Sequence, residues 1–158
     1  SNSFERLLGT DFDRVNELLD LRRVLEQRSA YLAAEYASPA DIADLAEIFA
    51  DIKRDVAAGG TGDHADARFH CAIAKAAGNT VLTHLMATLH GALVKASRLL
   101  ALRLMESDHY RDGMFELHVR IYEAIRDHDP KAAAAAMDAH FDFVLREFAQ
   151  YRTRAGET

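Results

Sequence analysis

An aspartate and a histidine share one face of a predicted helix in the middle of the chain. Asp66, His70, Ile73 and Ala77 follow one another at spacings of four, three and four residues, which places them on one face of an α-helix. A carboxylate and an imidazole therefore interrupt an apolar stripe. Burial of an unpaired carboxylate is costly, whereas a divalent cation held by both groups would turn that cost into binding energy.

Two histidines further along the chain occupy the same kind of position. His118 and His140 each lie where helical spacing predicts an apolar core side chain. Of the remaining histidines, three fall at turns: His64, His109 and His128. His84 lies on a polar helix face, and His90 lies at the edge of an apolar face. We therefore predict one metal site, with the ligands Asp66, His70, His118 and His140.

The predicted ligand set limits which metal ions can bind and which class of effector can bind to the metal. Imidazole nitrogens with one carboxylate suit Zn²⁺, Ni²⁺, Fe²⁺ or Mn²⁺, and the single cysteine, Cys71, excludes a thiolate cluster. Such a site keeps open coordination positions and a local charge of about +1, which favours a small carboxylate as the bound effector. Because ligating imidazoles must be neutral, metal affinity is expected to fall as the pH drops through about 6.

Three further polar residues are predicted to bind this effector. Arg22 interrupts an apolar stripe, so it either pairs with Glu26 on the helix surface, contributing about 0.2–0.5 kcal/mol, or grips a carboxylate through a bidentate fork. Asn79 either caps a helix or forms a hydrogen bond into the ligand site. His90 lies near apolar residues of its own helix, where it would line a cavity.

The elements that position these residues are all predicted to be helical. Apolar residues recur at spacings of three and four along most of the chain, and no alternating β-branched run occurs. Predicted helices cover residues 13–36, 39–57, a third segment capped by Thr61 or Asp63 and ending before Gly78, then 80–104, 114–127 and 131–152. Residues 106–113 are predicted to form a loop or a broken turn. Short connections favour an all-α antiparallel bundle of six to seven helices with the metal and ligand site in its interior.

Composition indicates one domain with an acidic surface. The chain has 158 residues, 49% of them hydrophobic, which suits one compact core. We predict a ligand-binding domain over residues 13–158, preceded at 1–12 by a segment that contains a tag remnant and a linker. The net charge of −6 provides no general attraction to nucleic acid or anionic lipid. One cysteine and no apolar leader predict a cytoplasmic protein without a membrane partner.

The same residues do not form a recognised enzyme motif. A di-iron bundle needs two Glu-x-x-His units, and the chain has one, Glu106 to His109, in the interrupted segment. The sequence contains no nucleophile elbow, His-Glu-x-x-His motif or glycine-rich phosphate loop. We therefore predict that the chain is not an enzyme. A mononuclear metal-dependent hydrolase or isomerase is the alternative, although no general base is evident, and a metal-free helical interaction module is a third interpretation.

The ordered motifs resemble a known family, the FCD domain. This domain is the C-terminal effector-binding domain of the FadR subfamily of GntR-type bacterial transcription regulators. The resemblance covers nearly the whole chain and rests on these motifs: Arg22-x-x-Leu25-Glu26, Leu32-Ala33-Ala34, Asp66-x-x-Phe69-His70, Ala76-Ala77-Gly78-Asn79, His118-x-x-Ile121-x-x-Ala124-Ile125, Asp129-x-x-Ala132 and Met137-x-x-His140. The sequence departs from the family pattern at Leu117, where Glu is common, and at His128-Asp129, where Gly-Asp is common.

The resemblance implies a sensor domain. Family members hold a divalent metal through one Asp and three His, and the matching positions here are the four ligands already predicted. They bind small organic or sugar acids and couple that event to an N-terminal winged helix-turn-helix. The implied partners are therefore a carboxylate effector, a second copy in a homodimer, and operator DNA contacted only through a DNA-binding domain missing from this chain.

Overall fold

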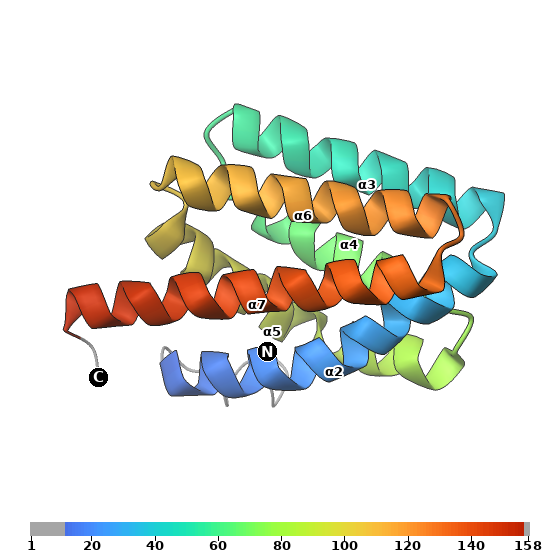
Figure 1. The fold of residues 1–158 in the computed structure, drawn as a ribbon, viewed down its shortest axis with the longest axis horizontal. Coiled ribbons are helices and arrows are strands. Elements are labelled where there is room, and N and C mark those ends of the chain that lie inside the picture. Colours follow the sequence, from blue (N-terminus) through green and yellow to red (C-terminus); the bar gives the residue numbers. More distant parts are fainter. Residues whose placement is uncertain (1–11, 157–158) are drawn as a thin grey trace.

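A computed structural model describes residues 12–156, which form an antiparallel bundle of six helices (Figure 1). The predicted segment 1–12 lies outside the described residues except for its last residue. The all-α prediction is confirmed. The helices, labelled as in Figure 1, are α2 (Phe12–Tyr36), α3 (Pro39–Ala57), α4 (Asp63–Ala76), α5 (Thr80–Leu104), α6 (Asp108–Arg126) and α7 (Pro130–Ala155).

Local capping explains why several helices begin where the sequence predicts. Ser38 and Asp41 form a capping box at the start of α3. The Asn79 side chain accepts a hydrogen bond of 3.0 Å from the backbone N–H of Leu82 and thereby caps α5. Asp129 caps α7 in the same way. These caps involve residues three positions apart, which is why the sequence alone reveals them.

Packing of the long helices creates an interior that is mostly apolar. α7 lies along α2 and α6, and α4 packs against α5, α3 and α2 (Figure 1). The main core is buried where α2, α4, α6 and α7 meet, and its centre contains Leu19, Phe69, Ile121, Met137 and Phe141. The functional side chains described below enter this core from α2, α4, α6 and α7.

The start of α6 corrects the prediction of a loop over residues 106–113. The helix begins at Asp108, after Ser107, whose side chain accepts a hydrogen bond from the Tyr110 N–H. Gly113 is unfavourable inside a helix by local propensity, yet it lies within α6. A Cβ at this position would come to 2.5 Å from the Phe143 ring, which explains why a glycine is present. The glycine therefore permits close packing of α6 on α7, a long-range contact that the local sequence does not show.

The start of α4 also differs from the prediction. The N-cap is Gly62 rather than Thr61 or Asp63, and its φ of +68° is a left-handed conformation that glycine adopts readily. The Gly62 N–H donates to the Asp55 side chain at 2.7 Å, and the Thr61 hydroxyl donates to Asp63 at 2.6 Å. Side-chain contacts with the preceding helix therefore replace the predicted cap.

The turn between α6 and α7 explains one departure from the family pattern. His128 has a φ of +55°, a backbone conformation that usually favours glycine. Its ring Nδ1 lies 2.8 Å from the Ala34 carbonyl oxygen at the end of α2. A carbonyl only accepts hydrogen bonds, so Nδ1 donates, and this bond helps to offset the backbone strain.

The high mean hydropathy of α5 has a structural explanation. Among residues 12–156, α5 is the one helix whose length and mean hydropathy would allow it to cross a membrane. A core helix of a soluble protein meets the same criterion. In this fold Leu82, Met86, Leu89 and Leu93 of α5 are buried against α4, so the apolar composition of the helix is explained by packing.

Candidate functional site

The structure brings the four predicted metal ligands together in the interior. Asp66 and His70 lie on α4, His118 on α6 and His140 on α7. Each offers a ligand atom, and these four atoms all lie within 4.8 Å of one another. The three histidines are at most 3% exposed, whereas Asp66 is half-buried. These four residues are called the histidine cluster below.

Hydrogen bonds fix the orientation of His118. Its Nδ1 lies 2.8 Å from the Met114 carbonyl oxygen one turn earlier in α6, so Nδ1 carries a proton. Its Nε2 lies 2.9 Å from Asp66 Oδ1, and Ser97 donates to the other Asp66 oxygen at 2.6 Å. Because Nδ1 donates to Met114, Nε2 is the ring nitrogen that faces Asp66, as it would in a shared metal site.

A buried ion pair from α2 supports His70. Arg22 Nε donates to Glu26 Oε1 at 2.6 Å, and Glu26 Oε2 pairs with His70 Nδ1. Both Arg22 and Glu26 are almost completely buried. Pairing through Nδ1 leaves His70 Nε2 facing Asp66 Oδ1, 3.5 Å away. Glu26 thus has the position of an outer partner that would orient the His70 imidazole as a ligand.

The charges of these groups are strongly coupled. Burial opposes protonation of His70, but the Glu26 and Asp66 carboxylates outweigh it and raise its pKa from 6.5 to about 9. Burial also opposes ionisation of Asp66, but His70 and His118 hold its pKa well below its usual range. In the absence of a metal ion, the proton on His70 therefore supplies the positive charge that the carboxylates require.

His140 provides the clearest indication of a missing partner. Neither ring nitrogen has a hydrogen-bond partner among the described residues, although both are buried. Burial, followed by the charges of His118 and His70, lowers the pKa of His140 well below 6.5, so the ring is neutral and keeps a free lone pair. Buried unpartnered nitrogen costs about 1–3 kcal/mol, and coordination of a cation would remove that cost. The residues therefore fit a divalent metal ion.

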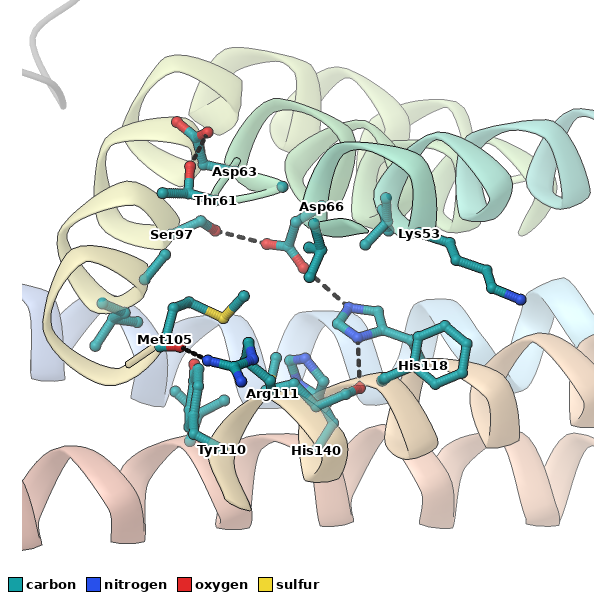
Figure 2. Close-up of a pocket in the computed structure, with 18 of the residues that line it drawn as sticks. Lys53, Thr61, Asp63, Asp66, Ser97, Met105, Tyr110, Arg111, His118 and His140 are labelled. Carbon is teal, nitrogen blue, oxygen red and sulfur yellow. Dashed lines mark hydrogen bonds and ion pairs between the residues drawn. The ribbon is translucent and has the colours of Figure 1, made fainter. Parts of the chain in front are cut away.

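A cavity of about 330 Å³ opens beside the cluster (Figure 2). Asp66, His118 and His140 line it at one end. Apolar side chains cover much of the remaining wall, among them Leu19, Ile52, Leu100, Ala101 and Val144. A small molecule in this cavity would therefore reach a metal ion held by the cluster.

The three predicted effector-binding residues have different locations. Arg22 lines the cavity, and its Nη2 has no hydrogen-bond partner among the described residues. Its predicted pairing with Glu26 is present as well, but the pair is buried rather than on the helix surface. Asn79 is exposed and caps α5, and His90 lies 3.5 Å from the Cys71 sulfur. Neither Asn79 nor His90 is among the described residues that line the cavity.

Sequence reasoning missed two polar residues of the site. Local sequence indicates no role for Glu26 in the site beyond its pairing with Arg22, because His70, which lies against it, is on another helix. Arg111 falls in the segment predicted to be a loop, yet it lies in the first turn of α6 and lines the cavity. A helix start at Ser107, a good N-cap residue, was the local signal for Arg111.

Comparison with known proteins gives consistent results. The sequence profile of the FCD domain matches residues 17–143. The chain is similar to the HTH-type transcriptional regulator LutR of Bacillus subtilis (strain 168), with 34% identity over 127 residues, 80% of this chain and 58% of LutR. It is also similar to the "Putative L-lactate dehydrogenase operon regulatory protein" of Escherichia coli (strain K12), with 30% identity over 139 residues, 87% of this chain and 53% of that protein.

A solved structure supports the same relationship. Streptococcus agalactiae GntR has a TM-score of 0.73 and 29% identity, with 88% of this chain and 62% of that chain covered. The chain spans about half the length of the curated relatives that it matches. These relatives are transcription regulators and not enzymes, which confirms the prediction about catalysis. Together with the buried histidine cluster, these matches show that the chain belongs to the FCD-domain family of GntR-type transcription regulators.

Proposed function

We propose that the histidine cluster holds one divalent transition metal ion, with Asp66, His70, His118 and His140 as ligands. The observation that carries this proposal is the buried His140 ring, which has two unpartnered nitrogens within a group of four converging ligand atoms. The donor set of three imidazoles and one carboxylate is suited to Zn²⁺, Ni²⁺, Fe²⁺ or Mn²⁺. The ion supplies a residual positive charge and open coordination positions at the end of the cavity.

The metal ion in turn anchors a small carboxylate effector. Arg22 lines the same cavity and has a free Nη2, so it is placed to bind a second carboxylate oxygen. The name of the Escherichia coli relative refers to an L-lactate dehydrogenase operon. A 2-hydroxy acid, whose hydroxyl and carboxylate oxygens can both reach one ion, is therefore the first class of compound to test.

Effector binding would control DNA binding by the whole protein. LutR is named as an HTH-type regulator and is longer than this chain, which supports a winged helix-turn-helix outside these 158 residues. The acidic net charge of −6 argues against specific operator binding by this domain alone. As a regulator of transcription, the protein would act in the cytoplasm. A homodimer would match a two-fold operator.

Metal analysis and thermal melts test the proposal together. The purified domain is expected to contain about one transition-metal ion per chain, and chelation is expected to lower its melting temperature. A 2-hydroxy acid at one hundred times its dissociation constant should add about 2.7 kcal/mol to the free energy of unfolding of the metal-loaded domain. Stabilisation that is unchanged after complete metal removal would show that the metal is not the anchor.

A further inference from the structure

The cavity is larger than a three-carbon acid requires. Its volume of about 330 Å³ corresponds to roughly eleven water molecules at ~30 Å³ each. A three-carbon hydroxy acid has six non-hydrogen atoms and would leave roughly half of this space to water. The cavity therefore accommodates an effector that extends well beyond the metal-bound carboxylate.

Arg111 provides a second anion-binding group in the cavity wall. Its Nη1 donates to the Met105 carbonyl oxygen at 2.6 Å, and its Nη2 pairs with Asp108. Figure 2 shows the guanidinium directed into the cavity next to this carbonyl. A guanidinium carries five N–H donors, and these two contacts leave three. Asp108 is 83% exposed, so water screens its charge and the pair is weak.

Part of the cavity wall is apolar, whereas Tyr110, which Figure 2 shows beside Arg111, contributes a hydroxyl. Leu100, Ala101 and Met105 at the end of α5, together with Val144 of α7, line the cavity. These side chains offer no hydrogen-bond partners for the hydroxyls of a polyol, whereas they pack favourably against methylene groups. The chemistry of this part of the cavity therefore favours an acid with an apolar chain.

We propose that the effector is a dicarboxylate whose first carboxylate binds the metal ion and whose second carboxylate binds Arg111, with methylene groups between them. This inference rests on the proposed function, because it assumes an anion at the metal. It assigns to Arg111 the selection of diacids over monoacids. Guanidinium binds a carboxylate in a fork of two parallel hydrogen bonds, which gives this selection its strength and direction.

The other charged residues of the cavity have different surroundings. Lys53 is exposed, and Figure 2 shows its ammonium directed away from the cavity. Asp112 is exposed and therefore screened. Asp63 is buried: its Oδ1 accepts the Thr61 hydroxyl, and its Oδ2 has no hydrogen-bond partner among the described residues. Figure 2 shows Asp63 on the opposite side of the cavity from Arg111. A ligand that binds Asp63 would carry hydrogen-bond donors, as a sugar acid does. A sugar acid is therefore the alternative to a dicarboxylate in this cavity.

Matched pairs of acids test the proposal on the metal-loaded domain. The diacids are 2-hydroxybutanedioate, 2-hydroxypentanedioate and 2-hydroxyhexanedioate. Their partners are the 2-hydroxy monoacids of the same chain length, in which a methyl group replaces the terminal carboxylate, and gluconate represents the polyol acids. Dissociation constants are measured by titration calorimetry at equal ionic strength. At the best chain length, the diacid is expected to bind at least about tenfold more tightly than its matched monoacid.

Two substitutions on α6 assign this difference to Arg111. Arg111→Gln is expected to remove the advantage of the diacid and to leave monoacid affinity within about twofold. Arg120→Gln is the matched control, because Arg120 is exposed and pairs with Glu116, and the advantage should persist. If Arg111→Gln does not fold, Arg111→Lys keeps the charge and removes the fork, and the advantage should shrink.

Several results would overturn the proposal. Equal affinity for diacids and monoacids at every chain length would do so, as would tighter binding of gluconate than of any diacid. Equal weakening of both acid classes by Arg111→Gln would reduce Arg111 to a structural role. Binding of monoacids without any preference for diacids would leave the proposed function standing. If the metal-loaded domain binds none of the acids, the proposed function itself fails and this inference fails with it.

Discussion

The two faces of α4 contact interiors of opposite character. Towards α5, Ala67 and Ala74 pack against Met86 and Leu89 in a wholly apolar cluster. Towards α6 and α7, the same helix presents the polar histidine cluster, in which His140 has no partner among the described residues. The first interior stabilises the fold through burial, whereas in the second the unpartnered His140 nitrogens cost stability until a cation binds. One helix thus combines a structural face with a face whose contribution depends on a ligand.

The largest expected effect is the loss of metal affinity when His140, which faces the polar side of α4, is replaced. His140→Leu should weaken metal binding by more than about a hundredfold, because loss of an outer partner alone costs up to that much. Without metal, the His140→Leu variant should melt at the same temperature as the metal-free wild-type domain or at a higher one. The reason is that an apolar side chain replaces two buried, unpartnered nitrogens. Metal competition with a chelator and thermal melts measure both effects.

The exposed His84 provides the control for this experiment. His84→Ala should leave metal affinity and stability nearly unchanged. Equal losses of metal from the two variants would contradict the assignment of His140 as a ligand.

Truncation on the apolar face should have the opposite pattern. Leu89 is completely buried, so Leu89→Ala should lower the free energy of unfolding by about 2–5 kcal/mol. The loss should be the same with and without metal, and metal affinity should not change. Chemical denaturation of both forms measures it, with Val81→Ala, at a site 79% exposed on the same helix, expected to stay within about 0.5 kcal/mol. A loss confined to the metal-loaded form would remove the distinction between the two faces.

Glu26 extends the comparison of the two faces of α4, because it is expected to affect metal binding through His70 rather than as a ligand. Glu26→Gln should weaken metal affinity about 10–100-fold, since the His70 imidazole loses its orienting carboxylate. In the metal-free domain the pKa of His70 should fall from about 9, which NMR titration can follow. Glu17→Gln, at an exposed position of the same helix, should change neither quantity. An unchanged pKa of His70 in Glu26→Gln would show that the pairing is not formed in solution.

The raised pKa of His70 shifts the pH dependence of metal binding upwards. Stability from the charged ring in the metal-free domain is present below pH 6.5 and is lost as the pH rises through about 9. A metal ion must displace this proton, so affinity should increase about tenfold per pH unit up to about pH 9. The window lies well above the value near 6 that the sequence suggests.

Calorimetry measures this proton directly. At pH 7.5, titrations in two buffers with different ionisation enthalpies should show release of about one proton per metal ion from His70. Release should approach zero at pH 10. Metal binding without proton release at pH 7.5 would contradict the raised pKa.

The smallest expected effect concerns Asn79. As the cap of α5, it should contribute about 1 kcal/mol to the free energy of unfolding, which Asn79→Ala should remove. Metal and effector affinities should not change, because Asn79 does not line the cavity. A selective loss of effector affinity in this variant would instead return Asn79 to the ligand site.

The sequence predicts what local rules determine. The predicted helix starts at residues 39, 80 and 131 and the predicted helix end before Gly78 depend on neighbouring residues, and they agree closely with the structure. The histidine cluster could be anticipated because each member breaks the apolar pattern of its own helix. Periodicity alone is sufficient to identify such an intrusion.

Contacts between distant residues account for what the sequence does not predict. The accommodation of Gly113 inside α6 involves Phe143, thirty residues later. The burial of Glu26 depends on His70, which lies on another helix. The Ser107 cap is a local signal for the helix that carries Arg111, but the position of Arg111 in the cavity depends on the packing of distant helices. Each error therefore arises where tertiary packing overrides a local preference.

The His118 ring also has a spectroscopic consequence. Its Nδ1 proton is bound to the Met114 carbonyl oxygen inside the bundle, so exchange with water requires local opening of α6. The proton should therefore give a persistent imidazole resonance, while the other nitrogen of the same ring faces the cluster. A diamagnetic ion such as Zn²⁺ would shift the resonances of this ring, and a paramagnetic ion would broaden them. One side chain can thus report both the occupancy of the site and the integrity of the helix that carries it.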